Sequence, residues 1–369
     1  MKSHINSIGT ANPSFKISQK ESFEFISRYL NLNEEEKNKM AILYRATGID
    51  FRYSVIEDFK NKPGHSSFFS DSKETKRFPS VSERMEVYKK KALPICVRAI
   101  EDCFSKFSDL TPPAVTHLIT VSCTGMYAPG LDIELIDKLK FKSSIQRTAV
   151  NFMGCYGAFN AIKVADAICR SDKSAKVLVV CVELCTLHLM DNKDEDHLLS
   201  GSLFGDGAAA ILISGSPLVD QTLSLESFYC DILREGKDDM AWHISDYGFQ
   251  MRLSSYVPEL IRGGIKTLTN NLLEHLKLNL SHIDIFAIHP GGKRILQVIE
   301  QELDLPKEKN HHAYKVLKKY GNMSSATVLF VLQSIMENLN REDDQKNILS
   351  FAFGPGLTLE SMLLKVKNN

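Results

Sequence analysis

A glycine-flanked cysteine between an apolar run and a helical pattern is the feature that most constrains this chain. Cys155 stands in NFMGCYG at 151–157, after Ala149 and Val150, and a helical pattern follows to about residue 170. A thiol at such a strand-to-helix turn faces unpaired N–H groups of the helix, whose dipole favours the thiolate. The glycines permit a tight turn and close approach by a substrate. A buried, inert cysteine is the commoner alternative, and this segment alone leaves both interpretations open.

Two later segments place other reactive side chains at the ends of regular elements. IDIFAIHPGG at 283–292 predicts a buried strand that ends at His289. YGNMSSA at 320–326 predicts a turn, containing Asn322, that opens a helix extending to about residue 336. Open-sheet folds build active sites at such ends. A histidine there is by itself more often structural, but Cys, His and Asn together favour catalysis.

These segments resemble the chalcone-synthase-like enzymes, the type III polyketide synthases. The matching motifs follow the family's order from about residue 115 to residue 365, whereas the first hundred residues match only loosely. They are GC at 154–155, VLVVCVE at 177–183, LFGDGA at 203–208, HPGG at 289–292, GNMSSA at 321–326 and FGPGLT at 353–358. The resemblance implies an α/β thiolase fold, with five αβαβα layers and two halves related by a pseudo-twofold axis. We expect the halves to span 1–215 and 216–369, because SGSP at 214–217 is a break signal.

Composition limits the classes of function. The 369 residues exceed one ordinary domain. Lys plus Arg balance Asp plus Glu at 45 each, which argues against a nucleic-acid partner. No stretch reaches the roughly 18–20 apolar residues of a membrane span, and residues 1–4 lead into no signal peptide. The eight cysteines form no CxxC pair, so we expect free thiols, no metal or other cofactor, and a reducing cytoplasm.

Apolar periodicity predicts the other elements. We expect helices at 21–36, 82–107, 258–279 and 324–339, buried strands at 115–123, 177–182, 208–214, 283–289 and 348–353, and exposed loops at 66–75 and 342–346. The second half repeats the alternation of strand and helix seen in the first, without a repeat at the level of residues.

The resemblance assigns roles to the three reactive residues. Cys155 would hold the acyl chain as a thioester, activated by His289 as an imidazolium–thiolate pair. His289 and Asn322 would donate hydrogen bonds to the malonyl thioester oxygen and stabilise the enolate that forms when carbon dioxide leaves. The enolate would then attack the acyl thioester, and the cycle would repeat. Phe204 matches a family aromatic that shields this centre from water; without the resemblance it would be an ordinary core residue.

Three positions depart from the plant members of the family. Met251 replaces a second family aromatic, near the active-site mouth, with a more adaptable side chain. Trp242, the only tryptophan, aligns with a glycine that lines the plant cyclisation pocket, and His188 aligns with a threonine. Both changes add bulk, so a small pocket that makes short pyrones or phloroglucinol-type products is one alternative.

Small residues on another side of the pocket favour a longer substrate. Ala128 replaces a methionine that crosses the dimer interface in plant members. Thr124, Ala128 and Cys185 together resemble the pattern of bacterial members that accept long acyl starters through a side tunnel. Ser324, in GNMSSA, completes the expected pocket. Each residue alone is better explained by ordinary packing, but the combination predicts a fatty-acyl-CoA starter and an alkylpyrone or alkylresorcinol product.

Coenzyme A needs cationic groups near its phosphates. Arg45, Arg52, Lys293 and Arg294 are the candidates, although a solvated surface charge is the commoner role for each. The resemblance also implies CoA thioesters as substrates and a homodimer, with residues 123–130 at its interface.

Three other functions compete with a polyketide synthase. A ketoacyl synthase III shares the fold and the Cys, His and Asn set, but it takes malonyl from an acyl-carrier protein and stops after one condensation. A Cys/His hydrolase is a different reaction class, and a thiolase-fold scaffold without activity would be expected to lose one of the three residues. The motifs GNMSSA and FGPGLT favour the polyketide synthase.

Overall fold

The computed structural model describes residues 2–62, 64–69, 78–254 and 256–368. The strands are β1 His4–Ala11, β2 Phe15–Ser18, β3 Phe51–Ser54, β4 His117–Ser122, β5 Gln146–Asn151, β6 Lys176–Leu184, β7 Asp206–Ser214, β8 Gln221–Ile232, β9 Met240–Ser245, β10 Gly248–Leu253, β11 Ile285–Ile288, β12 Asn347–Gly354 and β13 Thr358–Asn368. The α-helices are α1 Gln19–Tyr29, α2 Glu34–Ala46, α3 Val81–Phe104, α4 Leu131–Leu139, α5 Gly157–Ser171, α6 Glu195–Leu203, α7 Val257–His275, α8 Lys293–Glu302, α9 His311–Tyr320 and α10 Thr327–Met336.

Two halves of the chain have the same topology. In the first half β4, β6, β7 and β1 lie side by side, and in the second half β11, β12, β13 and β8 lie in the same order. The first pair of each set is parallel and the other two pairs are antiparallel. The chain also runs in the same sequence, β1-α3-β4-α5-β6-β7 and then β8-α7-β11-α10-β12-β13. This correspondence confirms the predicted repetition of one fold in two halves.

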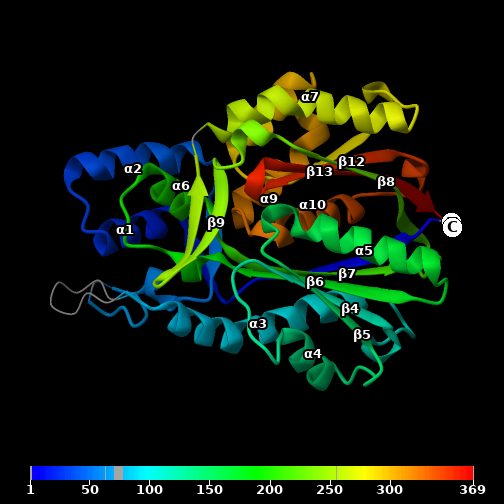
Figure 1. Cartoon of the computed structure of the whole chain (residues 1–369), viewed down its shortest axis with the longest axis horizontal. Helices are drawn as coiled ribbons and strands as arrows, with labels where there is room; N and C mark the ends of the chain where they lie inside the picture. The colour runs from blue at the N-terminus through cyan, green and yellow to red at the C-terminus, as the bar shows by residue number, and fades with distance from the viewer. Residues whose placement is uncertain (1, 63, 70–77, 255, 369) are drawn as a thin grey trace.

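The layers alternate between helix and sheet (Figure 1). α7 covers one outer face, α3 and α4 cover the other, and α5 and α10 lie between the two parts of the sheet. A helix enclosed on all sides should be apolar around its whole circumference. α10 meets this expectation, because eight of its ten residues are buried. The five predicted αβαβα layers are therefore confirmed, and the starts of α5 and α10 lie inside the molecule.

Most of the predicted elements are confirmed, but the helix expected at 21–36 is wrong. The chain instead forms α1 and α2, because Asn31 has a left-handed backbone with φ of 51°. Asn33 then caps a new helix by accepting from the backbone N–H of Glu36, whose side chain accepts from the N–H of Asn33. In the loop expected at 66–75, residues 70–75 lie outside the described residues, and Phe69 is buried rather than exposed.

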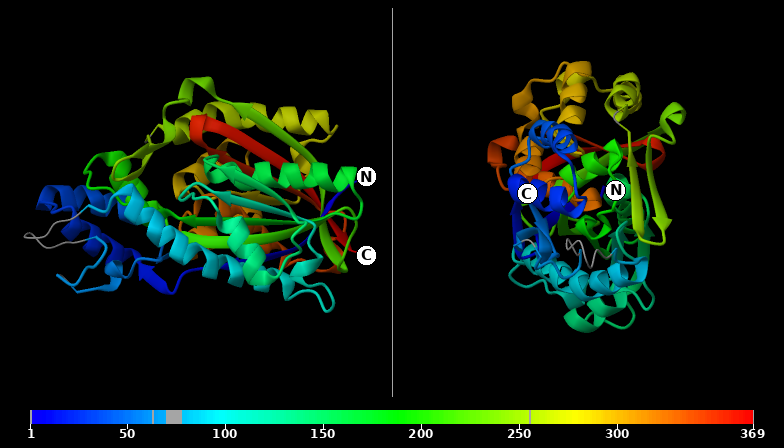
Figure 2. Two further views of the ribbon diagram at one scale, coloured as in Figure 1. Left: turned by 60° about the horizontal axis from the view of Figure 1, so that its bottom comes forward. Right: turned by 90° about the vertical axis from the view of Figure 1, so that its left-hand side faces the viewer.

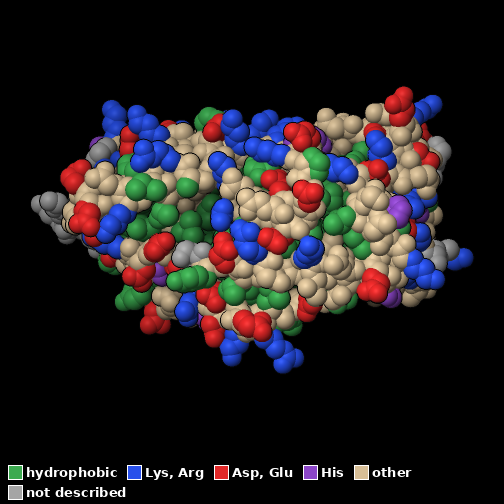
Figure 3. Space-filling view, turned by 90° about the horizontal axis from the view of Figure 1, so that it is seen from above, with side chains coloured by type: hydrophobic (Ala, Val, Ile, Leu, Met, Phe, Trp, Pro, Cys, Tyr) green, Lys and Arg blue, Asp and Glu red, His purple; other side chains and the backbone are tan. Residues whose placement is uncertain are grey.

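Both termini lie at one end of the molecule, opposite the end formed by α1 and α2 (Figure 2). β1 and the last residues of β13 both pair with β8 there. On the face drawn in Figure 3, Lys and Arg lie interspersed with Asp and Glu, and hydrophobic side chains gather beside a hollow. Among the described residues, no helix combines the length and the apolar composition that a membrane crossing requires.

Candidate active site

Cys155, His289 and Asn322 converge from different parts of the chain on one internal cavity. Cys155 lies in a 3-10 turn, Gly154–Tyr156, directly before α5. His289 follows β11, and Asn322 lies between α9 and the 3-10 turn Ser324–Ala326 that precedes α10. All three side chains are buried. The structure thus brings together the three residues that the sequence singled out.

The turn at Cys155 depends on glycine at position 154. Gly154 has a φ of +70°, a backbone region that residues with a Cβ adopt at a cost. A Cβ at this position would also lie 2.1 Å from Cδ of Pro355. The FGPGLT motif therefore packs directly against the nucleophile turn, and the two motifs require each other.

The amide of Asn322 has a fixed orientation. Its Oδ1 accepts from the backbone N–H of Ser324 at 2.8 Å, and its Nδ2 donates to the carbonyl of Gly291 at 3.3 Å. Nδ2 and Oδ1 both lie 4.0 Å from Sγ of Cys155, and Nδ2 has a second N–H besides the one that Gly291 accepts. An amide N–H in this place can donate to an oxygen of a thioester held at the sulfur.

The LFGDGA motif holds the backbone of Asn322. The N–H of Asn322 donates to the carbonyl of Leu203, and the N–H of Gly205 donates to the carbonyl of Asn322, both at 2.9 Å. Phe204 lies between these two hydrogen-bonded residues and lines the cavity. The motif therefore has two effects: it sets the position of the amide donor and it places an aromatic ring at the reacting centre.

The imidazole ring of His289 has no hydrogen-bond partner within the described part of the chain. Its backbone N–H donates to Phe351 of β12 at 2.8 Å, which fixes its main chain. Both ring nitrogens are buried and unpartnered. Burial lowers the pKa of His289 to about 3 and raises the pKa of the Cys155 thiol to about 12, so burial keeps both neutral at pH 7.

The expected imidazolium–thiolate pair is not formed in this structure. Among the described residues, no hydrogen bond joins Sγ of Cys155 to the ring of His289. The physical reason is that burial disfavours each charge separately. The pair stays a prediction for the working enzyme, where the N-terminus of α5 and the imidazole would have to offset this cost. A neutral imidazole still has one N–H to donate to a substrate oxygen.

Glu183, at the end of β6, is a buried carboxylate whose role the sequence did not reveal. It accepts hydrogen bonds from the backbone N–H of Cys123 at 3.0 Å, from Oγ1 of Thr124 at 2.9 Å and from Oγ of Ser325. Burial raises its pKa to about 7. Glu183 thus links the end of β4 to the turn before α10. A charged residue in the apolar run VLVVCVE was the available signal.

Hydrogen bonds hold the bulky residues of the pocket wall in place. Nε2 of His188 donates to the carbonyl of Thr124 at 2.7 Å, while Nδ1 accepts from the N–H of Phe249 at 3.0 Å, which defines a neutral imidazole. The ring stacks on Phe249 with 4.3 Å between centroids. Nε1 of Trp242 donates to the carbonyl of Cys123 at 2.6 Å. The hairpin β9–β10 is therefore fastened to the end of β4.

Seven of the eight predicted pocket residues line the same cavity as Cys155, His289 and Asn322. They are Thr124, Cys185, His188, Phe204, Trp242, Met251 and Ser324. Ala128 is the exception, because it lies in the exposed loop after β4, outside the cavity wall of its own chain. Because the position was expected to act across a dimer interface, its contribution to a pocket stays a prediction for the dimer.

Two of the four CoA candidates share one groove. Arg45, on α2, and Lys293, at the start of α8, both line an open groove that contains three further lysines. Gly291 and Ile295, on either side of Lys293, line the catalytic cavity. The segment that follows His289 therefore contributes residues to both the groove and the cavity.

Arg52 is wrong as a phosphate ligand. It is only 4% exposed, and its guanidinium donates to the carbonyls of Gly201 and Phe204 at 2.7 and 2.6 Å. Further donation to Gln19 and Ser22 leaves little capacity for a phosphate. Arg52 instead fixes the carboxyl end of α6, next to the LFGDGA motif.

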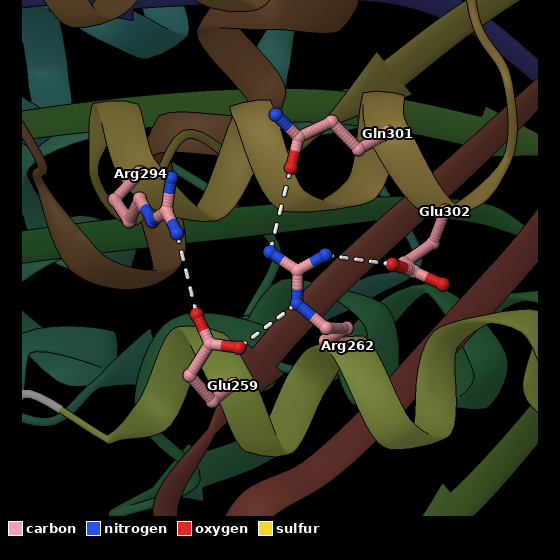
Figure 4. Close-up of polar contacts among 5 residues, drawn as sticks. All are labelled: Glu259, Arg262, Arg294, Gln301 and Glu302. Carbon is pink, nitrogen blue, oxygen red and sulfur yellow. Dashed lines mark hydrogen bonds and ion pairs between the residues drawn. The ribbon is translucent and has the colours of Figure 1, made fainter.

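Arg294 belongs to a surface network rather than to the groove. Its guanidinium lies 3.3 Å from the carboxylate of Glu259, on α7. The same carboxylate accepts from Arg262, which also pairs with Glu302 on α8 (Figure 4). These exposed ion pairs connect the two helices.

Among the described residues, no cluster of His, Cys, Asp and Glu side chains is arranged to hold a metal.

Comparison with solved structures gives the same fold over nearly the whole chain. PKS-I from the brown alga Ectocarpus siliculosus superposes with a TM-score of 0.88 at 28% identity, covering 99% of this chain and 98% of that one. The C-terminal type III polyketide synthase domain of Steely1, a type I/III hybrid from Dictyostelium, gives 0.89 at 26% identity and covers 99% of both chains.

Sequence comparison agrees with the structural one. A putative chalcone synthase of Bacillus subtilis is 30% identical over 374 residues, 97% of both chains. Pks18 of Mycobacterium tuberculosis, named an alpha-pyrone synthesis polyketide synthase-like protein, is 27% identical over 366 residues, 98% of this chain and 91% of that one. A probable polyketide synthase of Dictyostelium discoideum is 29% identical over 375 residues, and this chain spans only 11% of its length.

Family models cover both halves. The N-terminal domain of chalcone and stilbene synthases matches residues 2–217, and the C-terminal domain matches residues 224–367. The chain therefore belongs to the chalcone and stilbene synthase family, the type III polyketide synthases, which are acyltransferases of the thiolase fold.

Proposed function

We propose that this enzyme extends an acyl-CoA starter by repeated decarboxylative condensation with malonyl-CoA. The observation that carries the proposal is the convergence of a thiol, an amide donor and an unpartnered imidazole on one largely apolar cavity. Such a cavity excludes water, which would otherwise protonate an enolate or hydrolyse a thioester. The reaction uses CoA thioesters and the enzyme's own side chains, without a metal or an organic cofactor.

The first half-reaction loads the starter onto Cys155. The thiol of Cys155 passes its proton to His289 as the sulfur attacks the starter's carbonyl carbon. The carbon–sulfur bond to CoA breaks, and the CoA thiolate takes up the proton from the imidazolium. The products are an acyl thioester on Cys155, free CoA and a neutral His289.

The second half-reaction makes the new carbon–carbon bond. Asn322 Nδ2 and the N–H of His289 donate to the thioester oxygen of malonyl-CoA, on which negative charge develops as carbon dioxide leaves. The enolate carbon attacks the acyl carbonyl on Cys155, and the cysteine sulfur leaves. The chain, now two carbons longer, is a β-keto thioester of CoA that can be loaded again.

The starter that we propose is a fatty acyl group, with an alkylpyrone or alkylresorcinol as the product. The apolar wall supports this choice, as does the small side chain of Cys185 in it. Pks18, whose name specifies alpha-pyrone synthesis, is a similar protein. A second candidate is a short pyrone, because hydrogen bonds fix the bulk of His188 and Trp242 in the wall.

CoA would bind in the groove that Arg45 and Lys293 line. The phosphates of CoA require cations, and the groove offers both side chains, with Lys293 in the segment that also contributes Gly291 and Ile295 to the cavity. Homodimer formation is part of the proposal. β5 is the edge strand of the sheet, and five of its six residues are exposed in the single chain. A second copy pairing there would cover this edge.

Mass spectrometry of products from malonyl-CoA and a panel of acyl-CoA starters tests the proposal. We expect triketide or tetraketide products whose mass follows the chain length of the starter. Replacing malonyl-CoA by malonyl on an acyl-carrier protein is the control, since a ketoacyl synthase III would use the carrier and stop after one condensation. A single condensation that proceeds only with the carrier would contradict the proposal, and preference for acetyl-CoA over long starters would favour the short pyrone.

A further inference from the structure

Two histidines share an unusual environment. Among the described residues, only His197 and His289 have both ring nitrogens buried without a hydrogen-bond partner. Both of them line the catalytic cavity. Buried polar groups that lack a partner in the protein call for an explanation, such as a ligand that arrives later. For His289 the explanation is the substrate thioester, and the same reasoning applies to His197.

His197 faces the cavity from α6. Ser200 and Gly201, three and four residues later on the same face of the helix, also line the cavity. α6 packs against β10, the strand that carries Met251 (Figure 1). His197 therefore reaches the substrate space from a different element than any of the three catalytic residues.

Six other polar side chains of the wall are already occupied. They donate to, or accept from, partners within the protein: Arg52, Thr124, Thr186, His188, Ser200 and Trp242. A polar group of a bound molecule on the α6 side would thus find its hydrogen-bond partner in His197. Burial lowers the pKa of His197, so its ring is neutral at pH 7 and offers one donor and one acceptor.

We propose that His197 binds the keto oxygens of the growing chain and thereby supports extension beyond the first condensation. This inference rests on the proposed function. A fatty acyl starter brings no polar group beyond its thioester. Each condensation then adds one carbonyl group, so that successive carbonyl groups lie two carbons apart in the growing chain. The carbonyl oxygen accepts from the imidazole N–H of His197, which is otherwise left buried and unpaired.

His197→Leu and His197→Gln test the role through the distribution of products. In the Leu variant we expect loading of Cys155 and decarboxylation of malonyl-CoA within about two-fold of the unsubstituted enzyme. The ratio of products with two or more extensions to products with one should fall about ten-fold, the effect of one buried hydrogen bond. The Gln variant, which keeps an N–H donor, should recover part of that ratio.

Thermal unfolding of the free enzyme supplies a second measurement. Leu removes a buried polar group without a partner, so the melting temperature of His197→Leu should be equal to or above that of the unsubstituted enzyme. The matched control is His312→Leu. His312 is also buried, but its Nδ1 is 2.9 Å from Oγ of Ser334, so this variant should melt lower and keep the product ratio.

Three results would overturn the assignment. One is an unchanged product ratio in His197→Leu. Another is a uniform rise of KM for every CoA thioester, which would mean that His197 binds the pantetheine arm. The third is a lower melting temperature, which would mean a structural role. If the unsubstituted protein forms no polyketide at all, the proposed function is wrong, and the role of His197 that rests on it is wrong as well.

Discussion

The two halves of the molecule share one topology but present different side chains at equivalent positions. In each half a 3-10 turn leads into a helix of the central layer, at Gly154–Tyr156 before α5 and at Ser324–Ala326 before α10. The first turn presents the thiol of Cys155. The second follows Asn322, whose amide is fixed by its own turn and points at that sulfur.

The difference between these turns indicates how a duplicated fold becomes an asymmetric active site. His289 follows β11, and the equivalent strand β4 is followed by Cys123 and Thr124, which serve the wall instead. In the proposed reaction the first half supplies the acyl carrier, and the second half supplies the donors for enolate formation. Glu183 connects the two through Thr124 and Ser325.

Variants that separate product formation from the decarboxylation of malonyl-CoA give the largest expected effect. Cys155→Ala should abolish product formation, because no acyl thioester can form, yet leave slow decarboxylation of malonyl-CoA. Asn322→Ala should instead lower decarboxylation roughly 100–1,000-fold, the effect of removing one oxyanion donor. Release of labelled carbon dioxide, measured beside product yield, separates the two. Full product formation by the Cys155 variant would contradict the assignment.

Glycine substitutions in the two halves should differ in how much they lower the free energy of unfolding. Gly154→Ala combines a positive φ with a clash against Pro355, so we expect a loss of about 3 kcal/mol in the free energy of unfolding. The matched change Gly356→Ala has the same sign of φ, but its nearest neighbour is 3.8 Å away. It should cost about 1 kcal/mol. Urea denaturation measures both, and equal losses would contradict the close packing of the two motifs.

The link between the halves should appear in the pH dependence of stability. Burial raises the pKa of Glu183 in the fold to about 7, from an ordinary value of 4.5. The folded state therefore binds a proton that the unfolded state has lost, and the free energy of unfolding should fall as the pH rises from about 4.5 to about 7. The fall should amount to at most about 3 kcal/mol and should be absent in Glu183→Gln. Parallel pH profiles for both proteins would refute this.

Thiol ionisation tests how the second half acts on the first. Burial raises the pKa of Cys155, so in His289→Gln the rate of alkylation should rise only at a pH well above the free-thiol value of about 8.5. With His289 present to take the proton, the inflection should lie at lower pH. Peptide mapping after iodoacetamide treatment measures Cys155 separately from the other cysteines. Identical inflections would mean that the imidazole does not assist ionisation.

The smallest expected effect concerns the starter. If acyl chains lie along the wall at Cys185, each additional methylene should contribute up to about 0.8 kcal/mol and lower KM until the cavity is full. Cys185→Phe should remove that trend and spare short starters. Steady-state kinetics with a series of acyl-CoA chain lengths measures it. A flat series in the unsubstituted enzyme would favour the short-pyrone alternative.

The convergence of Cys155, His289 and Asn322 on one cavity and the layers could be predicted, because each of these residues stands at the end of a regular element and each apolar run has the period of its element. The break after α1 could not, since Asn33 and Glu36 cap a helix through a local hydrogen-bond exchange that periodicity does not register. Arg52 shows a second limit. Sequence marks it as a charge, and only tertiary contacts show that its guanidinium is occupied by backbone carbonyls.

The unpartnered nitrogens of His197 illustrate a third limit. Spacing gave no reason to select this histidine. Its role is inferred from the absence of a hydrogen-bond partner for either ring nitrogen among the described residues. Ala128 shows the reverse case, since alignment with a pocket position places it in a wall that its own chain does not form. The environments of His197 and Ala128 depend on which side chains surround them in three dimensions, and sequence patterns do not specify these neighbours.

The division of labour between the halves has one direct test. Mass spectrometry of peptides after incubation with an acyl-CoA alone should find the acyl group on Cys155 in both the unsubstituted enzyme and Asn322→Ala. After addition of malonyl-CoA, only the unsubstituted enzyme should convert that group into extended product. An acyl group on another cysteine, or loss of loading in Asn322→Ala, would contradict the claim that one half carries the chain while the other generates the enolate.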